Sequence, residues 1–399
     1  VYGTGIEVDN MIIKNCRIIS ESGISEPKDI LIENGLIKRT GTFDSIDSYD
    51  AHDNFVCSGF IDIHTHGGYG ADFMDATEDA FDTALKFHID NGTTSVVATS
   101  CTSPTEQILS FVECAREYKR HEPPYAKLLG VHLEGPFLSV KNRGAQKQEY
   151  LMSPDTDSYD FILKNKDVIK TVTISPELVG ADIMTKELSE CGIIVCGGHD
   201  DGIYPEFMPS VNAGLKHLTH IYCAMSELRF KNGARNVGLR EYGLIDNRLS
   251  CEIIADNKHM PSELVHMILK CKGANKTALV SDSLRCAGMP IDNRLYKLGC
   301  NDADDAQSVK VADGVAVIFD GSRFAGSITP IHQMIKNLID SGIDITDAVA
   351  MGTSTPANII GADNIGRIFS GYTADICILN EKFDIIDVFK DGELMCIEH

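Results

Sequence analysis

The chain has 399 residues, 43% hydrophobic and 24% charged, which is typical of a globular protein. This length exceeds one ordinary domain but suits an α/β barrel of about 250–300 residues with a smaller second domain. The formal net charge of −22 argues against a nucleic-acid partner, because a phosphate backbone requires a basic face.

The predicted elements begin with short strands separated by turns, which is typical of hairpins. These strands are Met11–Ile13, Cys16–Ile19, Asp29–Glu33 and Leu36–Lys38. From Ser58 onward, apolar strands alternate with helical patterns such as Thr77–Asn91 and Thr105–Arg120, and this alternation predicts a parallel sheet. The eight expected strands are Phe60–His64, Ser95–Thr99, Leu128–Glu134, Thr171–Ser175, Ile193–Gly197, Leu215–His220, Cys251–Ala255 and Thr277–Asp282.

The β pattern of the N-terminal region returns near the C-terminus, in Ala374–Leu379 and Ile385–Lys390. The simplest architecture is a (β/α)₈ TIM barrel, residues 58–362, inserted into a small β-sandwich domain made from both chain ends. The two parts of that domain are residues 1–57 and 363–399.

Neither a membrane span nor an export signal is expected. No apolar run approaches the ~20 residues that span a bilayer, and residues 1–5 lack the basic and apolar regions of a secretory signal. The 13 cysteines are odd in number, scattered, and without a C-x-x-C pair. We therefore expect free thiols in a reducing compartment and a cytoplasmic protein.

Candidate metal ligands stand at the ends of the predicted barrel strands. His64 and His66 are two residues apart on one strand and so share a face, while Glu134, His199 and His220 end or closely follow three further strands. The C-terminal strand ends of such barrels meet at the active site. Imidazoles with a carboxylate suit Zn²⁺, with Fe²⁺ as the alternative. The plainer interpretation of the first pair is two structural histidines in a turn.

Other polar residues near these strand ends divide by position. His132 lies one layer deeper than Glu134, so a supporting or packing role is expected. His217 has the opposite parity to His220 and is predicted to be structural. His259 follows strand seven and is expected to lie over the site. Asp282 closes strand eight; alone it could be a helix cap, but beside a metal ion it is the expected proton acceptor.

Several phrases form a recognisable set: Gly59–Gly67, His132–Phe137, Thr219–Met225, Ile253–His259, Leu279–Asp282, Phe324–Ser327 and Gly366–Ile376. Together they resemble the N-acetylglucosamine-6-phosphate deacetylases of the amidohydrolase superfamily, over essentially the whole chain. The resemblance implies metal-dependent hydrolysis of the N-acetyl group of an N-acetylhexosamine 6-phosphate to acetate and the amino-sugar phosphate. The first substrate it implies is N-acetyl-D-glucosamine 6-phosphate. It also implies a homodimer in which a neighbour's residues reach the phosphate.

The resemblance implies roles for single residues. It implies one or two metal ions per subunit, with Glu134 bridging the two ions. The implied ligands are Glu134, His199, His220, His64, His66 and Asp282. Asp282 is implied to carry a proton from the attacking water to the leaving amine, and His259 to contact the reacting amide. Arg235 is implied to bind the phosphate, for which a guanidinium is well shaped.

Two positions depart from the family pattern. Cys223-Ala224 stands where the family has Asn-Ala, and Gly144-Ala145-Gln146 where it has Gly-x-His. A thiol is a weaker hydrogen-bonding group than an amide, and glutamine lacks a titratable ring. Both changes are expected to affect substrate recognition and not the metal. N-acetylgalactosamine 6-phosphate therefore stays open as the substrate.

Three further alternatives stay open. Lys141 and Arg143 either add to the cationic patch or are solvated loop charges. Another amidohydrolase activity, on a cyclic amide or an N-acyl amino acid, is disfavoured because many such enzymes bridge their metals with a carboxylated lysine, where this chain has Glu134. A sugar-phosphate binder without turnover is disfavoured because every metal candidate and Asp282 are retained.

Overall fold

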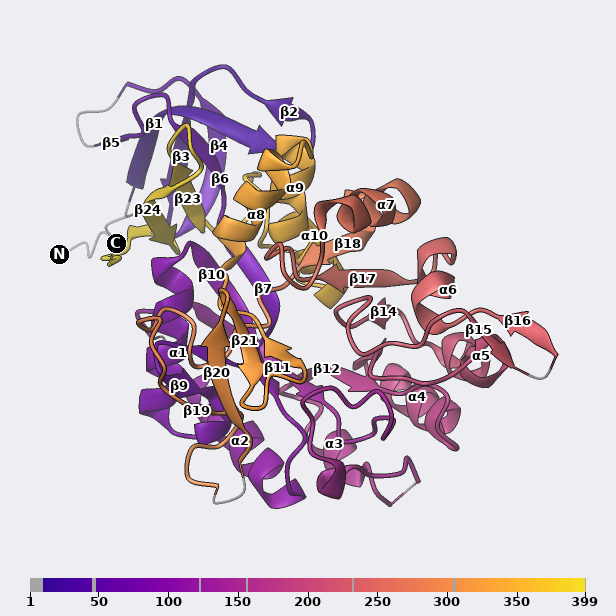
Figure 1. The fold of residues 1–399 in the computed structure, drawn as a ribbon. Helices are drawn as coiled ribbons and strands as arrows, with labels where there is room; N and C mark the ends of the chain where they lie inside the picture. Colours follow the sequence, from indigo (N-terminus) through magenta and orange to yellow (C-terminus); the bar gives the residue numbers. More distant parts are fainter. Residues whose placement is uncertain are drawn as a thin grey trace.

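The computed structural model describes residues 10–44, 48–121, 123–155, 157–231, 233–303 and 306–398. Two large sheets organise it (Figure 1): an eight-stranded parallel sheet, and a nine-stranded sheet that joins strands from both ends of the chain. The first carries the candidate site and the second stands beside it.

The eight-stranded sheet is the barrel, and its strands neighbour one another in chain order, all parallel. They are β7 (Phe60–Thr65), β10 (Thr93–Ser100), β11 (Lys127–Glu134), β12 (Ile169–Ile174), β13 (Ile194–Gly197), β14 (His217–Leu218), β17 (Ser250–Ile253) and β18 (Thr277–Leu279). Each overlaps a predicted strand, so the TIM-barrel prediction is confirmed. The first and last strands meet beyond the ladder, where the Asp282 N–H donates to the His64 carbonyl at 2.9 Å.

Helices follow the barrel strands and bury one face each. They are α1 (Glu78–Asp90), α2 (Thr105–Tyr118), α3 (Asp160–Lys164), α4 (Ala181–Glu190), α5 (Tyr204–Ala213), α6 (Leu239–Ile245), α7 (Ser262–Lys272), α8 (Ile331–Asp340), α9 (Ile345–Gly352) and α10 (Ser354–Ile360). In α1, Thr77 caps the first turn by accepting the Ala80 N–H, and Phe81 and Leu85 are buried one turn apart. Across the described ranges, none of the helices has the length and apolarity that a bilayer crossing requires.

The nine-stranded sheet has the order β25-β24-β23-β6-β1-β3-β4, with β2 and β5 also paired to β1. Its strands are β1 (Asn10–Ser20), β2 (Gly23–Ile24), β3 (Lys28–Glu33), β4 (Leu36–Gly41), β5 (Tyr49–Asp50), β6 (Phe55–Ser58), β23 (Ile376–Leu379), β24 (Ile385–Lys390) and β25 (Glu393–Leu394). The two strands predicted within β1 are one strand, because the break is a bulge between Ile13 and Cys16. Asn15, with φ of 55°, absorbs it, a conformation that asparagine tolerates.

An antiparallel sheet inserted after β18 was not predicted. Its strands are β19 (Tyr296–Lys297), β20 (Ser308–Ala312), β21 (Val315–Ile318) and β22 (Phe324–Gly326). We call it the cover sheet. It has a small core of its own around Leu284, Tyr296 and Val309. A bridge from Ser283 to Ser327 ties it to the C-terminal end of the barrel.

Two small hairpins complete the loops at this end of the barrel. One pairs β8 (Gly67–Gly68) with β9 (Ala71–Asp72), and the other pairs β15 (Arg229–Lys231) with β16 (Ala234–Asn236). The β15–β16 hairpin projects away from the barrel (Figure 1).

Candidate active site

The five histidine and glutamate candidates meet at the C-terminal mouth of the barrel. Glu134 Oε1 lies 3.0 Å from both His199 Nε2 and His220 Nε2. Its Oε2 lies 3.6 Å from His66 Nε2, and Oε1 lies 3.7 Å from His64 Nε2. The ligand atoms of His64, His66 and Glu134, and those of Glu134, His199 and His220, each lie within 4.8 Å of one another. Two candidate ion sites therefore share one carboxylate.

The backbone at these positions is held in an uncommon conformation. His199, His220 and Asp282 have φ of 50°, 26° and 45°, in the left-handed region that costs a residue with a side chain about 1–3 kcal/mol. The chain next to His66 is equally tight, because a Cβ on Gly67 would lie 2.1 Å from the Ala71 carbonyl oxygen. The strand ends are thus bent to direct their side chains at one point.

The electrostatics of Glu134 match a ligand carboxylate. Burial alone would raise its pKa, but the hydrogen bonds with His199 and His220 hold that pKa well below its usual range. The glutamate is 3% exposed, so its charge is poorly screened by solvent. The group is therefore ionised and able to bind a cation.

A second buried carboxylate, Glu252 on β17, supports the ligands and was missed by the sequence analysis. Its Oε2 lies 3.0 Å from His64 Nδ1 and accepts the His220 N–H at 3.1 Å, and its Oε1 lies 3.0 Å from His217 Nε2. The residue is 1% exposed. Burial opposes its ionisation, but His64 and His217 lower its pKa well below the usual range. The sequence did offer one indication of this role, because Glu252 is the single charged residue of a buried strand, between Cys251 and Ile253.

The residues present fit a divalent ion. Glu252 Oε2 contacts Nδ1 of His64, and the other ring nitrogen, Nε2, is buried without a hydrogen-bond partner among the residues described. A carboxylate that holds the far nitrogen of an imidazole is the usual support of a metal-binding histidine. The nitrogen and oxygen donors are those that Zn²⁺ and Fe²⁺ accept.

The predicted proton acceptor lies at the same point. Asp282 Oδ1 is 3.2 Å from His66 Nε2 and 3.7 Å from His64 Nε2. Its backbone is tied on both sides, with its N–H bonded to His64 and its carbonyl accepting the Ser327 N–H at 2.8 Å. The carboxylate is thus fixed beside the first histidine pair, between the barrel and the cover sheet.

A cavity of about 520 Å³ opens above these residues, within the range of small-molecule sites. His259, Cys223, Ala224 and Gln146 line it, as the sequence analysis expected of substrate contacts. His259 Nδ1 lies 2.8 Å from Asp256 Oδ2, and the Phe324 ring of the cover sheet packs at a tilt against the His259 imidazole, with 4.8 Å between centroids.

Gln146 differs from expectation in its contacts. Its Nε2 donates to Glu134 Oε2 at 2.6 Å, so this departure from the family pattern does touch a metal candidate. The physical reason is the close approach of the loop after β11. At Gly144, with φ of +59°, a Cβ would lie 3.1 Å from the His199 ring. The turn here, in which the Gln146 N–H donates to the Arg143 carbonyl at 2.9 Å, brings the Gln146 side chain to Glu134.

The cationic residues differ in whether they line this cavity. Arg235 is exposed on the β15–β16 hairpin and does not line this cavity. Arg143 does not line it either, and donates to the Val140 carbonyl. Lys141 lines the cavity but pairs with Asp201 at 2.8 Å. Arg323 of the cover sheet, which the sequence analysis missed, lines the cavity and donates to the Gly144 carbonyl at 2.9 Å.

A family model described as the amidohydrolase family matches residues 55–395. The chain belongs to the amidohydrolase family. Among its relatives in that family is an N-acetylglucosamine-6-phosphate deacetylase of Bacillus subtilis, 30% identical with 98% of each chain covered. An N-acetylgalactosamine-6-phosphate deacetylase of Escherichia coli O157:H7 is 26% identical, with 96% of this chain and 98% of that protein covered.

The amidohydrolase fold is also seen in solved structures. The crystal structure of N-acetylglucosamine-6-phosphate deacetylase from Pasteurella multocida matches with a TM-score of 0.89 and 25% identity, covering 96% of this chain and 99% of that one. The match extends over both sheets, so the barrel and the terminal β domain together form the shared architecture.

Proposed function

We propose that the protein removes the N-acetyl group of an N-acetylhexosamine 6-phosphate, first N-acetyl-D-glucosamine 6-phosphate, and releases acetate and the amino-sugar 6-phosphate. The observation that carries this is the convergence of Glu134, His199, His220 and Asp282 beneath one cavity. The similarity to deacetylases of this class over nearly the whole chain supports it.

The reaction requires a nucleophilic water, polarisation of the amide carbonyl and protonation of the leaving nitrogen. A divalent ion held by Glu134, His199 and His220 would lower the pKa of the attacking water and act as a Lewis acid toward the carbonyl. Asp282 accepts the proton of the attacking water as the C–O bond forms, and passes it to the nitrogen as the C–N bond breaks. No proton is gained or lost by the carboxylate over the cycle.

The remaining site residues orient the substrate in this proposal. Asp256 accepts a hydrogen bond from Nδ1–H of His259, which leaves Nε2 to contact the amide of the substrate. Burial, with Asp282 and Asp256 nearby, raises the pKa of the Cys223 thiol to about 12, so it meets the sugar as a neutral, weak hydrogen-bonding group. A weak group at this place supports keeping the galacto epimer as an alternative substrate.

The phosphate requires a cation in a chain of strongly negative charge. We assign Arg323 to it within the subunit, because it lines the cavity and forms no ion pair with a carboxylate of the described residues. Arg235 remains proposed as a phosphate contact as well. Its exposed hairpin supports a homodimer in which it reaches the neighbouring cavity.

Two finer assignments are also proposals. Zn²⁺ is the preferred ion, with Fe²⁺ as the alternative, and the two ligand sets support one or two ions per subunit. Cytoplasmic location is supported by the cysteines, all thirteen of which are free.

Acetate release tests the proposed function. The Zn²⁺-loaded protein is expected to turn over N-acetylglucosamine 6-phosphate or its galacto epimer, and chelation is expected to stop the reaction. A loaded protein that releases no acetate from either sugar phosphate contradicts the proposal.

A further inference from the structure

The amide of Gln146 is fixed in one orientation by the main chain. The residue is 6% exposed, and its Oε1 accepts the backbone N–H of Thr102 at 2.7 Å. A backbone N–H can only donate, so the oxygen of the amide must face Thr102. The NH₂ group must therefore face Glu134, and its hydrogen bond to Oε2 at 2.6 Å follows from this constraint.

The two oxygens of Glu134 have different surroundings. Oε1 lies 3.0 Å from His199 and from His220, whereas Oε2 faces His66 at 3.6 Å. The hydrogen bond from Gln146 thus falls on the oxygen nearest His66. Groups that hydrogen-bond to a ligand carboxylate orient it, and their loss typically costs about 10–100-fold in metal affinity.

We propose that Gln146 is a positioning residue for a second ion. Through its N–H on Glu134 Oε2 it sets the affinity of the His64–His66–Glu134 set, while the set formed with His199 and His220 does not depend on it. This inference rests on the two-ion centre of the proposed function.

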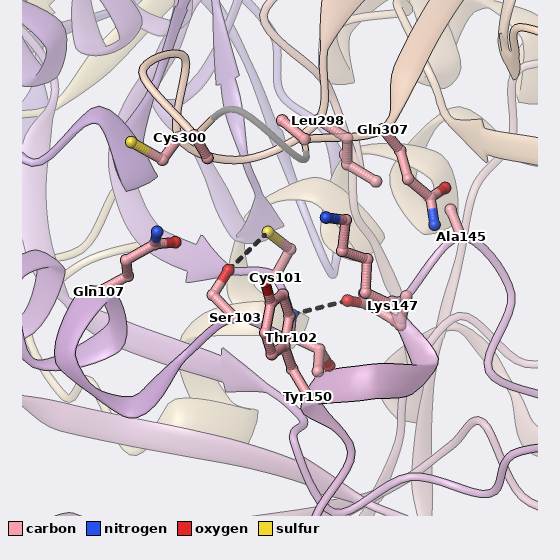
Figure 2. A pocket seen from close by; sticks show the side chains of 13 residues that line it. Cys101, Thr102, Ser103, Gln107, Ala145, Lys147, Tyr150, Leu298, Cys300 and Gln307 are labelled. Atoms are coloured by element: carbon pink, nitrogen blue, oxygen red, sulfur yellow. Dashed lines mark hydrogen bonds between the residues drawn. The ribbon is translucent and has the colours of Figure 1, made fainter.

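Gln146 lines a small cavity in addition to the large one. This small cavity, of about 20 Å³, is also lined by Cys101, Thr102 and Gln107 (Figure 2), and it holds about one water molecule. The cavity is too small for a ligand. Without substrate present, a substitution of Gln146 is therefore expected to act through Glu134.

Calorimetric titration of Zn²⁺ into the chelator-treated, dialysed full-length protein tests the proposal. Wild type is expected to bind two ions, and His66→Asn identifies the step that belongs to the second. Gln146→Leu removes the donor and is expected to weaken that step about 10–100-fold, with less than a threefold change in the other. Gln146→Met, which is close to glutamine in length, also removes the donor and is expected to weaken the same step.

Gln107→Leu is the matched control, since Gln107 lines the same small cavity and has no bond to the ligand residues in the part of the chain described. It is expected to leave both steps unchanged. The visible absorption of the first Co²⁺ equivalent is expected to be the same in wild type and in both Gln146 variants. If Gln146→Leu does not fold, the same titration of Gln146→Met decides the question.

Three results would overturn the inference. One is an unchanged affinity for the second ion in Gln146→Leu. Another is an equal weakening of both binding steps in the Leu and Met variants, which would indicate a general structural role. The third is a single binding step in wild type, which removes the two-ion centre while leaving a one-ion deacetylase intact. Acetate release by wild type, measured separately, reports on the proposed function itself.

Discussion

Replacing Glu252 tests whether the missed carboxylate supports the ligand histidines. Glu252→Ala removes the acceptor shared by His64 Nδ1, His217 Nε2 and the His220 N–H, all at 3.0–3.1 Å and all buried. A hydrogen bond to a charged group is worth about 1.5–3 kcal/mol. The three contributions are not additive, and breaking a buried ion pair by removing one partner costs about 3–5 kcal/mol. We expect the free energy of unfolding to fall by that amount.

The isosteric variant should lose less. In Glu252→Gln the amide oxygen still accepts from His64, and its NH₂ can donate to His217 in the other ring tautomer, which transfers the ring proton to the side of Ser250. The expected order of stability is therefore wild type, then Gln, then Ala. Zn²⁺ affinity is expected to follow the same order, with about a 10–100-fold loss in the Ala variant.

The assay is urea unfolding followed by circular dichroism, with chelator present so that metal binding does not contribute. Glu263→Ala, at an exposed position on α7, is the control and should change the free energy of unfolding by no more than about 0.5 kcal/mol. A loss below about 1 kcal/mol in Glu252→Ala, or an unchanged Zn²⁺ affinity, would refute the role assigned to this carboxylate.

Three further predictions concern catalysis, specificity and pH. Asp282→Asn should lower kcat by about 10²–10⁴-fold with little loss of Zn²⁺ from the Glu134–His199–His220 set, and retained turnover would remove Asp282 from proton transfer. Arg323→Gln should raise KM at least about tenfold for phosphorylated substrate but not for N-acetylglucosamine, because a charged hydrogen bond to the phosphate is lost. The same pair of KM values for Arg235→Gln tests the hairpin arginine. Equal effects on both substrates would exclude the substituted residue from the phosphate site. Burial lowers the pKa of His88 to about 3, below its unfolded value of 6.5. Between these values the unfolded chain binds a proton that the folded protein does not, so wild type should lose stability as pH falls below 6.5. With chelator present, the free energy of unfolding of wild type should fall by about 1.4 kcal/mol per pH unit relative to His88→Gln. Parallel plots of unfolding free energy against pH for the two proteins would contradict this prediction.

The barrel and its ligands could be predicted because local pattern and global geometry agree there. Strands of a parallel barrel are buried on both faces, so they stand out as apolar runs, and the residues that end them meet by topology. His64 and His66 share a face by period, and the structure places both against Glu134. In the nine-stranded sheet the β1 bulge broke this agreement, since one strand with a kink resembles two short strands in sequence.

The rest depended on contacts between distant segments. The cover sheet consists of short strands in a mixed polar sequence, and its position over the mouth is set by tertiary packing. Arg323 and Arg235 are both exposed, and nothing local distinguishes the one that lines the cavity. Gln146 bonds to a residue twelve positions earlier through a turn at Gly144, which the sequence pattern does not reveal.

The most direct test of the central claim is kcat/KM for acetate release by the Zn²⁺-loaded protein. The substrates to compare are N-acetylglucosamine 6-phosphate, its galacto epimer and unphosphorylated N-acetylglucosamine. We expect a strong preference for a phosphorylated sugar, with the gluco phosphate first. Preference for the epimer would keep the chemistry and reassign the specificity to the region of Cys223. Indifference to the phosphate, or no acetate from any of the three, would contradict the account.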